Sequence, residues 1–357
     1  MEHILRTLIA FHTVEDDIQA IHQGMDYIAT FVAERGMHIE RFEEGGHESL
    51  IATTQPGNKT PKVMLAAHLD VVHGADELFE LRKADGRLYG RGTLDMKFAI
   101  AAYLQCIDDL QANLADYDIG LMITSDEELG GQDGTMKLLQ EGYIPEVCIL
   151  PDGGDNWQIQ ISSKGILYLR LQSYGTEAHG SRPWRGVNAI EPLMETLLEI
   201  KTLFKQSGPK ANTLNIGKIH GGEAFNQVPA YAEAIIDIRT TSEAEKPPLL
   251  EQITGICASH NVALSILEDG SATNFSLDSP FIAPFARQIT AVTGITVVGA
   301  HTLGSNDTRY FAPHNVPCVS LYPTGGSHHG PDEWISEEAF YQFRTILSNY
   351  LKEVARR

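Results

Sequence analysis

The chain has 357 residues, of which 43% are hydrophobic, so it is long enough to form more than one hydrophobic core. Its 47 acidic side chains outnumber the 27 basic ones, which gives a formal net charge of -20. A protein of this charge repels nucleic acid phosphates and anionic lipid, so neither a nucleic acid nor a membrane is expected as a partner. No apolar run reaches membrane-spanning length.

The N-terminal segment predicts an amphipathic helix rather than a signal peptide, because it has an early acid, no basic cluster and only a short apolar stretch. The cysteines lie far apart and form no CxxC pair; they are Cys106, Cys148, Cys257 and Cys318. They therefore indicate neither a disulfide framework nor a thiolate zinc site. Together these features predict a cytoplasmic protein with reduced thiols.

Four apolar segments lead to side chains that can bind metals or move protons. They are VMLAAHLD (63–70), IGLMITSDEE (119–128), EVCILPD (146–152) and VPCVSLYPTGGSHH (316–329). Near-continuous apolar runs are typical of strands in a parallel sheet that is covered on both faces. Helical patterns lie between them, at 96–111 and 134–142. The alternation predicts an open, mostly parallel α/β sheet flanked by helices, with ligands bound beyond the carboxyl ends of the strands.

From about Lys164 the pattern changes to that of a smaller α+β unit. Strand-like and helical segments follow in the order strand, helix, strand, strand, helix, strand, at 164–175, 189–204, 212–221, 230–240, 247–260 and 262–269. This is the order of a ferredoxin-like unit. We therefore predict a catalytic domain of residues 1–163 and 277–357, interrupted by an inserted domain of residues 164–276.

Two-metal hydrolysis needs a bridging carboxylate, terminal histidine and carboxylate ligands on each ion, and an acid or base near the bridging water. His68 and Asp70 follow the first apolar run, where Asp70 could orient a ligating His68. The HxD pair alone is more typical of a structural histidine beside a solvated aspartate. Asp95 follows a loop made tight by Gly90 and Gly92 and precedes a helical pattern, so it is either a helix N-cap or a bridging ligand.

Three consecutive acids, Asp126, Glu127 and Glu128, follow the second apolar run. Their side chains point in different directions, so one can bind a metal while another moves protons. A solvated loop is the alternative, which is less favoured because this loop ends a wholly apolar strand. Asp152 and the pair His328 and His329 complete the set, although each alone has a structural explanation.

The set as a whole is more informative than its parts. Histidines combined with carboxylates suit zinc, and also cobalt or manganese. Two divalent ions would carry four positive charges, which Asp95, Glu128, Asp152 and a bridging hydroxide would balance, since uncompensated buried charge is costly. Glu127 would then remain free for acid–base catalysis.

With these residues in place, the sequence resembles the co-catalytic two-zinc metallopeptidases, which include glutamate carboxypeptidase, peptidase T, carnosinase-like exopeptidases, acetylornithine deacetylase, aminoacylase and succinyl-diaminopimelate desuccinylase. The resemblance covers nearly the whole chain and rests on an ordered series of motifs: AAHLDVV, GRGTLDMKFAIAA, SDEELGG, LPDGGD, GTEAHGSRPWRGVNAI, GGEAFNQVPAYAEAIIDIR, GSNDTRYF and HHGPDEWIS. It implies a hydrolase that cleaves an amide bond of a small peptide or N-acyl amino acid.

The resemblance also implies roles for individual residues. His68 and Asp152 would bind one ion, Glu128 and His329 would bind the other, and Asp95 would bridge the two ions. His329 is preferred to His328 because the family pattern places a glutamate four residues beyond the ligating histidine, and Glu333 is there. Glu127 matches the general base, and Asp70 matches the residue that orients His68.

For the inserted domain, the resemblance implies a lid that forms a homodimer and lends His179 to the partner's active site. Without its motif, His179 would be taken for a surface loop histidine. Asn226, Arg239 and Arg309 match positions near the substrate, and arginine suits a terminal carboxylate through paired charged hydrogen bonds. Arg239 could equally form a structural ion pair.

The implied chemistry uses the metals to lower the pKa of a shared water from about 15.7 towards 7, with Glu127 taking its proton and passing it to the leaving amine. Asp152 stands where many deacylase-type members carry glutamate and several di- and tripeptidases carry aspartate. An exopeptidase of the dipeptidase or carboxypeptidase type is therefore expected. An N-acyl amino acid deacylase is the alternative, and a non-catalytic metal-binding or scaffold protein is the rival from another class.

Overall fold

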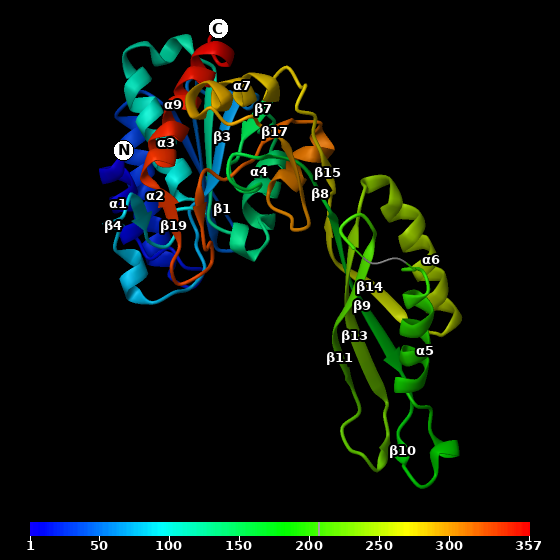
Figure 1. Ribbon diagram of the computed structural model, residues 1–357. Coiled ribbons are helices and arrows are strands. Elements are labelled where there is room, and N and C mark those ends of the chain that lie inside the picture. Colours follow the sequence, from blue (N-terminus) through cyan, green and yellow to red (C-terminus); the bar gives the residue numbers. More distant parts are fainter. Residues whose placement is uncertain (206–207) are drawn as a thin grey trace. The chain divides into compact units, whose positions relative to one another are not determined.

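The computed structural model describes residues 1–205 and 208–357, which form two compact units (Figure 1). The first unit comprises Met1–Ser162, Phe275–Thr302 and Asn306–Arg357. The second comprises Ser163–Asn274 and Leu303–Ser305. Among the residues described, no helix is long and apolar enough to cross a membrane.

The first unit is built on a six-stranded sheet. Its strands lie in the order β1 (His38–Glu44), β2 (His47–Thr53), β6 (Ile119–Thr124), β3 (Val63–His68), β7 (Val147–Ile149) and β17 (Cys318–Val319). The last four run parallel, whereas β1 and β2 form an antiparallel hairpin that pairs with β6. Every residue of β3 and β6 is buried, as their continuous apolar sequences require. The predicted α/β class is confirmed.

Five long helices bury apolar side chains in the core of this unit: α1 (Glu2–Ala10), α2 (Ile18–Ala33), α3 (Lys97–Leu110), α7 (Ile282–Thr293) and α9 (Glu337–Val354). Phe98 of α3 meets Phe343 of α9 edge to face, with ring centroids 5.2 Å apart. Shorter helices are α4 (Lys137–Gln140) and α8 (Thr308–Phe311), and a π-helical turn covers Gln132–Met136. The strands β8 (Ile159–Ser163) and β16 (Gly299–Thr302) pair outside the main sheet.

A small antiparallel sheet joins two loops that are distant in the sequence. Its strands are β18 (Gly325–Gly326), β19 (Trp334–Ser336), β5 (Arg87–Tyr89) and β4 (Arg82–Ala84), in that order. In the pairing of β19 with β5, Trp334 lies opposite Tyr89. Since Asp95 follows β5 and His329 precedes β19, this pairing brings both segments to one edge of the unit.

The second unit has the strand and helix order of a ferredoxin-like fold. Its elements are β9 (Gly165–Tyr174), α5 (Ile190–Lys201), β11 (Thr213–Gly221), β13 (Tyr231–Thr240), α6 (Lys246–Ser259) and β14 (Ala263–Gly270). The sheet is antiparallel in the order β11-β13-β9-β14. Alternate residues of β13 are buried, which matches the alternation in its sequence. A short pair, β10 (Ala178–His179) with β12 (Gln227–Val228), lies in the same unit.

Candidate active site

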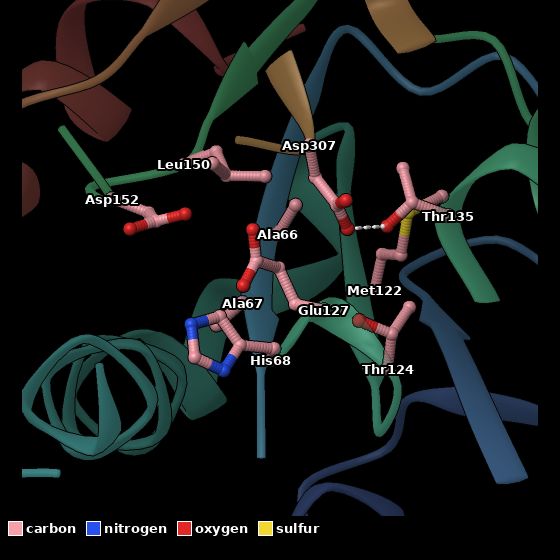
Figure 2. Close-up of a pocket in the computed structure, with 10 residues that line it drawn as sticks. All are labelled: Ala66, Ala67, His68, Met122, Thr124, Glu127, Thr135, Leu150, Asp152 and Asp307. Atoms are coloured by element: carbon pink, nitrogen blue, oxygen red, sulfur yellow. Dashed lines mark hydrogen bonds between the residues drawn. The ribbon is translucent and has the colours of Figure 1, made fainter. Parts of the chain in front are cut away.

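The parallel strands of the first unit bring two predicted ligands, His68 and Asp152, and the predicted base, Glu127, to one end of the sheet. His68 is the last residue of β3, and Glu127 opens a 3₁₀ turn (Glu127–Leu129) just after β6. Asp152 follows β7 by a short loop. Figure 2 shows His68, Glu127 and Asp152 around one small pocket, with Asp307 on its far side. These side chains lie beyond the carboxyl ends of the parallel strands, which is where the sequence predicted the site.

Two groups of side chains are placed to hold metal ions: His68 with Glu127 and Asp152, and Asp95 with Glu128 and His329. Within each group, the potential ligand atoms lie within 4.8 Å of one another. Asp95 is also shared, because its Oδ1 lies 3.2 Å from His68 Nε2 and its Oδ2 lies 3.0 Å from His329 Nε2. The two oxygens of one carboxylate therefore face the two predicted histidine ligands, which is the arrangement that a bridging ligand needs.

The charges of these groups fit a pair of cations. Burial and the neighbouring charge of Asp95 raise the pKa of Asp152 to about 7. Burial and the charge of Asp152 raise the pKa of Glu127 well above its ordinary value. Hydrogen bonds to Asp95 and Glu128 raise the pKa of His329 to about 10. These raised pKa values mean that the two buried carboxylates and the His329 imidazole favour their protonated forms, and bound metal ions would supply positive charge in place of those protons.

His68 contacts the residue that the HxD motif indicated, but through the main chain of Asp70 rather than its carboxylate. Its Nδ1 lies 2.9 Å from the main-chain carbonyl of Asp70, whereas the distance to Asp70 Oδ1 is 3.6 Å. A proton on Nδ1 is therefore donated to the Asp70 carbonyl, which leaves Nε2 free to bind a metal. The Asp70 side chain instead accepts a hydrogen bond from the backbone N–H of Glu128, at 2.9 Å. Asp70 thereby connects residues of both groups.

Three contacts at the site, made by Tyr322 and Thr135, were not predicted. The hydroxyl of Tyr322 donates to Asp152 Oδ1 at 2.5 Å, and the Tyr322 ring stacks on His328 with centroids 5.9 Å apart. The hydroxyl of Thr135 donates to Asp307 Oδ2 at 2.5 Å inside the pocket of Figure 2. Tyr322 lies just beyond β17, so its position after a buried strand was the available signal.

Arg309 lies in the first unit, where it is buried and donates through Nη2 to the carbonyl of Gly130 at 2.6 Å. Gly130 ends the turn that begins at Glu127, so Arg309 contacts the loop that carries the predicted base. Arg239, in the second unit, donates to Asp237 Oδ1 at 2.8 Å and to the Tyr168 hydroxyl at 2.7 Å. The ion pair weighed for Arg239 is therefore present, and its role near the substrate stays a prediction.

His179 and Asn226 are neighbours in the second unit. The N–H of Gly180 donates to the carbonyl of Asn226 at 2.6 Å, and His179 pairs with Gln227 between β10 and β12. The His179 ring is exposed, and its Nδ1 lies 2.8 Å from Ser181 Oγ. Hence two of the three residues predicted to serve the reaction from the inserted domain lie in one loop region there.

Residues 64–353 match the family model "Peptidase family M20/M25/M40". The chain belongs to this family. This membership confirms the predicted family resemblance and the predicted hydrolase class. M20 hydrolases are two-metal enzymes. In this M20 hydrolase, two groups of side chains could hold such ions.

Relatives and solved structures agree on the family but differ in activity. The chain is 29% identical to succinyl-diaminopimelate desuccinylase of Acidiphilium cryptum over 90% of each chain, and 28% identical to that of Caulobacter vibrioides over 93% of this chain and 92% of the relative. Its fold is similar to a tripeptidase from Staphylococcus aureus (TM-score 0.79, 20% identity, 100% and 98% covered). It is also similar to an M20 family metallo-carboxypeptidase from Sulfolobus solfataricus (TM-score 0.76, 18% identity, 98% of each covered).

We predict that Tyr322→Phe weakens zinc binding at the group that contains Asp152 by about tenfold or more, because contacts to metal ligands commonly contribute 10- to 100-fold in affinity. Calorimetric zinc titration of chelator-treated protein measures the effect. Tyr231→Phe is a matched control, since its hydroxyl also donates to a carboxylate, Glu233 Oε2 at 2.6 Å, but in the second unit. Equal zinc affinities in Tyr322→Phe and the unaltered protein would contradict the prediction.

Proposed function

We propose that this M20 hydrolase is an exopeptidase of the dipeptidase or carboxypeptidase type. The main support for a two-metal site is the position of the Asp95 carboxylate. One of its oxygens faces the His68 ring and the other faces the His329 ring. His68 and Asp152 would hold one ion, Glu128 and His329 the other, and Asp95 both. The mixed nitrogen and oxygen ligands favour zinc, with cobalt or manganese as alternatives.

Bound metals would supply a water of lowered pKa and polarise the scissile carbonyl. The protein's own part is to move the proton. Two observations support this role for Glu127: its side chain lines the pocket beside His68 and Asp152, and burial and the charge of Asp152 raise its pKa. A carboxyl group with a raised pKa can accept a proton and release it to the leaving amine near neutral pH.

We predict that Glu127→Ala retains its metal ions and loses turnover by about 100-fold or more, the usual contribution of a positioned acid or base. Steady-state kinetics and metal analysis on the same sample measure the two effects separately. Glu141→Ala, which removes an exposed acid of the same unit, controls for surface charge and should leave both unchanged. Turnover of Glu127→Ala within twofold of the unaltered enzyme would overturn the role of Glu127.

We propose a peptide substrate rather than an N-acyl amino acid because of the residue at position 152, which is an aspartate. In the family, several di- and tripeptidases carry aspartate at this position and many deacylases carry glutamate. Here the shorter carboxylate is held by Tyr322 at 2.5 Å. An N-acyl amino acid deacylase is the second candidate, and the sequence likeness to the desuccinylases favours it.

A substrate panel separates these candidates. It should contain dipeptides, tripeptides, and the N-acetyl and N-succinyl derivatives of the same amino acids, each scored by kcat/KM. We expect a peptide to give the highest kcat/KM by about tenfold or more, which corresponds to about 1.4 kcal/mol in transition-state binding. The highest value for an N-succinyl amino acid would instead establish the deacylase.

We further propose that the second unit is a lid that forms a homodimer and lends His179 to the partner's active site, with Asn226, Arg239 and Arg309 near the substrate. In support, β11 is an edge strand with Ile219 60% exposed, and on α5 the side chain of Leu198 is 64% exposed. Exposed apolar residues on an unpaired edge favour association. Sedimentation at the mass of a single chain would contradict the dimer.

A cytoplasmic location is proposed on the chemistry of the cysteines. All four are free and buried within the described chain. Burial raises the pKa of Cys106 to about 12 and that of Cys257 to about 11, so these thiols are protonated and unreactive at neutral pH. Such thiols suit a reducing compartment, where no disulfide is needed for stability.

A further inference from the structure

A buried glutamate, Glu333, forms hydrogen bonds with the main chain of the loop that contains Asp95. Glu333 is 1% exposed, and its carboxylate accepts hydrogen bonds from three backbone N–H groups. Oε1 accepts from Leu94 at 2.8 Å and from Asp95 at 3.1 Å, and Oε2 accepts from Gly92 at 3.0 Å. The carboxylate therefore holds the main chain of Asp95 itself and of the residues that lead to it.

Arg91 extends this contact to the loop that carries His329. Its Nη1 donates to Glu333 Oε2 at 2.8 Å, and both side chains are buried. Its Nη2 donates to the carbonyl of His73 at 3.2 Å and to the carbonyl of His329 at 3.4 Å. One guanidinium group thus joins the loop of Arg91 to His73, 18 positions earlier, and to the distant segment of His329 and Glu333, and its planar set of donors suits it to do so.

The main chain at this point needs such support. Gly90 and Gly92 have φ of 153° and 82°, and His329 itself has φ of 59°. These are left-handed conformations that side-chain-bearing residues such as His329 seldom adopt, and they persist where surrounding contacts fix them. Regular secondary structure does not hold either segment, because β5 ends at Tyr89 and β19 begins at Trp334.

We infer that Glu333 and Arg91 form a positioning pair that sets the metal site of Asp95, Glu128 and His329. The inference rests on the proposed function only in that this group binds an ion. Neither side chain of the pair belongs to a candidate metal-binding group of the described residues. They act through the backbone, by holding Asp95 and His329 at the separation in which Asp95 Oδ2 lies 3.0 Å from His329 Nε2. Ligands must be held within about 0.5 Å of their productive geometry for tight binding.

A buried ion pair could also serve the fold alone, and the two roles differ in what they predict. A structural pair would lower stability when broken and leave the metal affinity of the folded protein unchanged. A positioning pair would lower the affinity for one of the two ions in protein that is still folded. The other ion would keep more of its affinity, because His68 and Asp152 are carried by β3 and by the loop after β7.

The test is a calorimetric zinc titration of chelator-treated protein. Glu333→Gln keeps the size of the side chain but replaces one accepting oxygen with an amide, so part of the set of backbone acceptors is lost. We expect one of the two zinc affinities to fall by about 10- to 100-fold, and the other to change less. Glu333→Asp keeps the charge on a shorter stem and should fall between Glu333→Gln and the unaltered protein. Unchanged affinities for both ions in folded Glu333→Gln would overturn the inference.

Ser336→Ala is the matched control for stability. Ser336 is the N-cap of α9, three residues beyond Glu333, and its hydroxyl accepts from the N–H of Ala339. Loss of this cap should lower the unfolding midpoint and leave both zinc affinities unchanged. If Ser336→Ala weakened zinc binding as much as Glu333→Gln, the effect would be one of general stability and the inference would be wrong.

A second variant covers the case in which Glu333→Gln does not fold because Arg91 keeps an unpaired buried charge. Arg91→Met combined with Glu333→Gln removes both charges, and we expect it to fold with the same loss of zinc affinity. Zinc affinities equal to those of the unaltered protein in this double variant would overturn the inference. Failure of the unaltered protein to bind two ions would instead refute the proposed function, so the two failures are distinguishable.

Discussion

The structure of the first unit depends on one constraint, the crowding of carboxylates at the carboxyl ends of buried parallel strands. Asp70, Asp95, Glu127, Glu128, Asp152 and Asp307 lie within this small region, and most of them are buried. Water cannot solvate these groups there, so each needs a donor or a cation. The nearby histidines, Tyr322 and Thr135 supply donors, and a pair of metal ions of the kind that M20 enzymes use would supply the remaining positive charge.

The same constraint explains why the ligands are supported in two ways. His68 is the last residue of β3, where it pairs with Thr124 of β6, and Asp152 lies in a short loop just after β7. Asp95 and His329 come from irregular loops, and for these the fold supplies the buried contacts of Arg91 and Glu333. Asp95 lies between the two kinds of support: one of its oxygens faces His68, which ends a strand, and the other faces His329, which lies on a loop. If the backbone of Asp95 were poorly held, the site of Glu128 and His329 would loosen more than that of His68 and Asp152, which follow strands of the sheet.

Much of the architecture was predictable because its signals are local. Each predicted ligand followed an apolar run or a glycine turn, and the α+β order of the second unit could be predicted from alternation and helical spacing alone. The hairpin of β1 and β2 was missed, since most residues of β1 are exposed and give no apolar pattern. The contacts of Tyr322 with Asp152 and of Glu333 with Asp95 join residues 170 and 238 positions apart. Such pairings depend on the folded topology, so a single sequence does not reveal them.

The most direct test of the account is the number of zinc ions bound by chelator-treated protein, measured beside Asp95→Asn and the exposed control Asp116→Asn. If Asp95 bridges, the unaltered protein and Asp116→Asn should each bind two ions per chain and regain turnover with zinc, and Asp95→Asn should bind both ions more weakly. Binding of a single ion by the unaltered protein, full turnover without metal, or two unchanged affinities in Asp95→Asn would contradict the two-metal site.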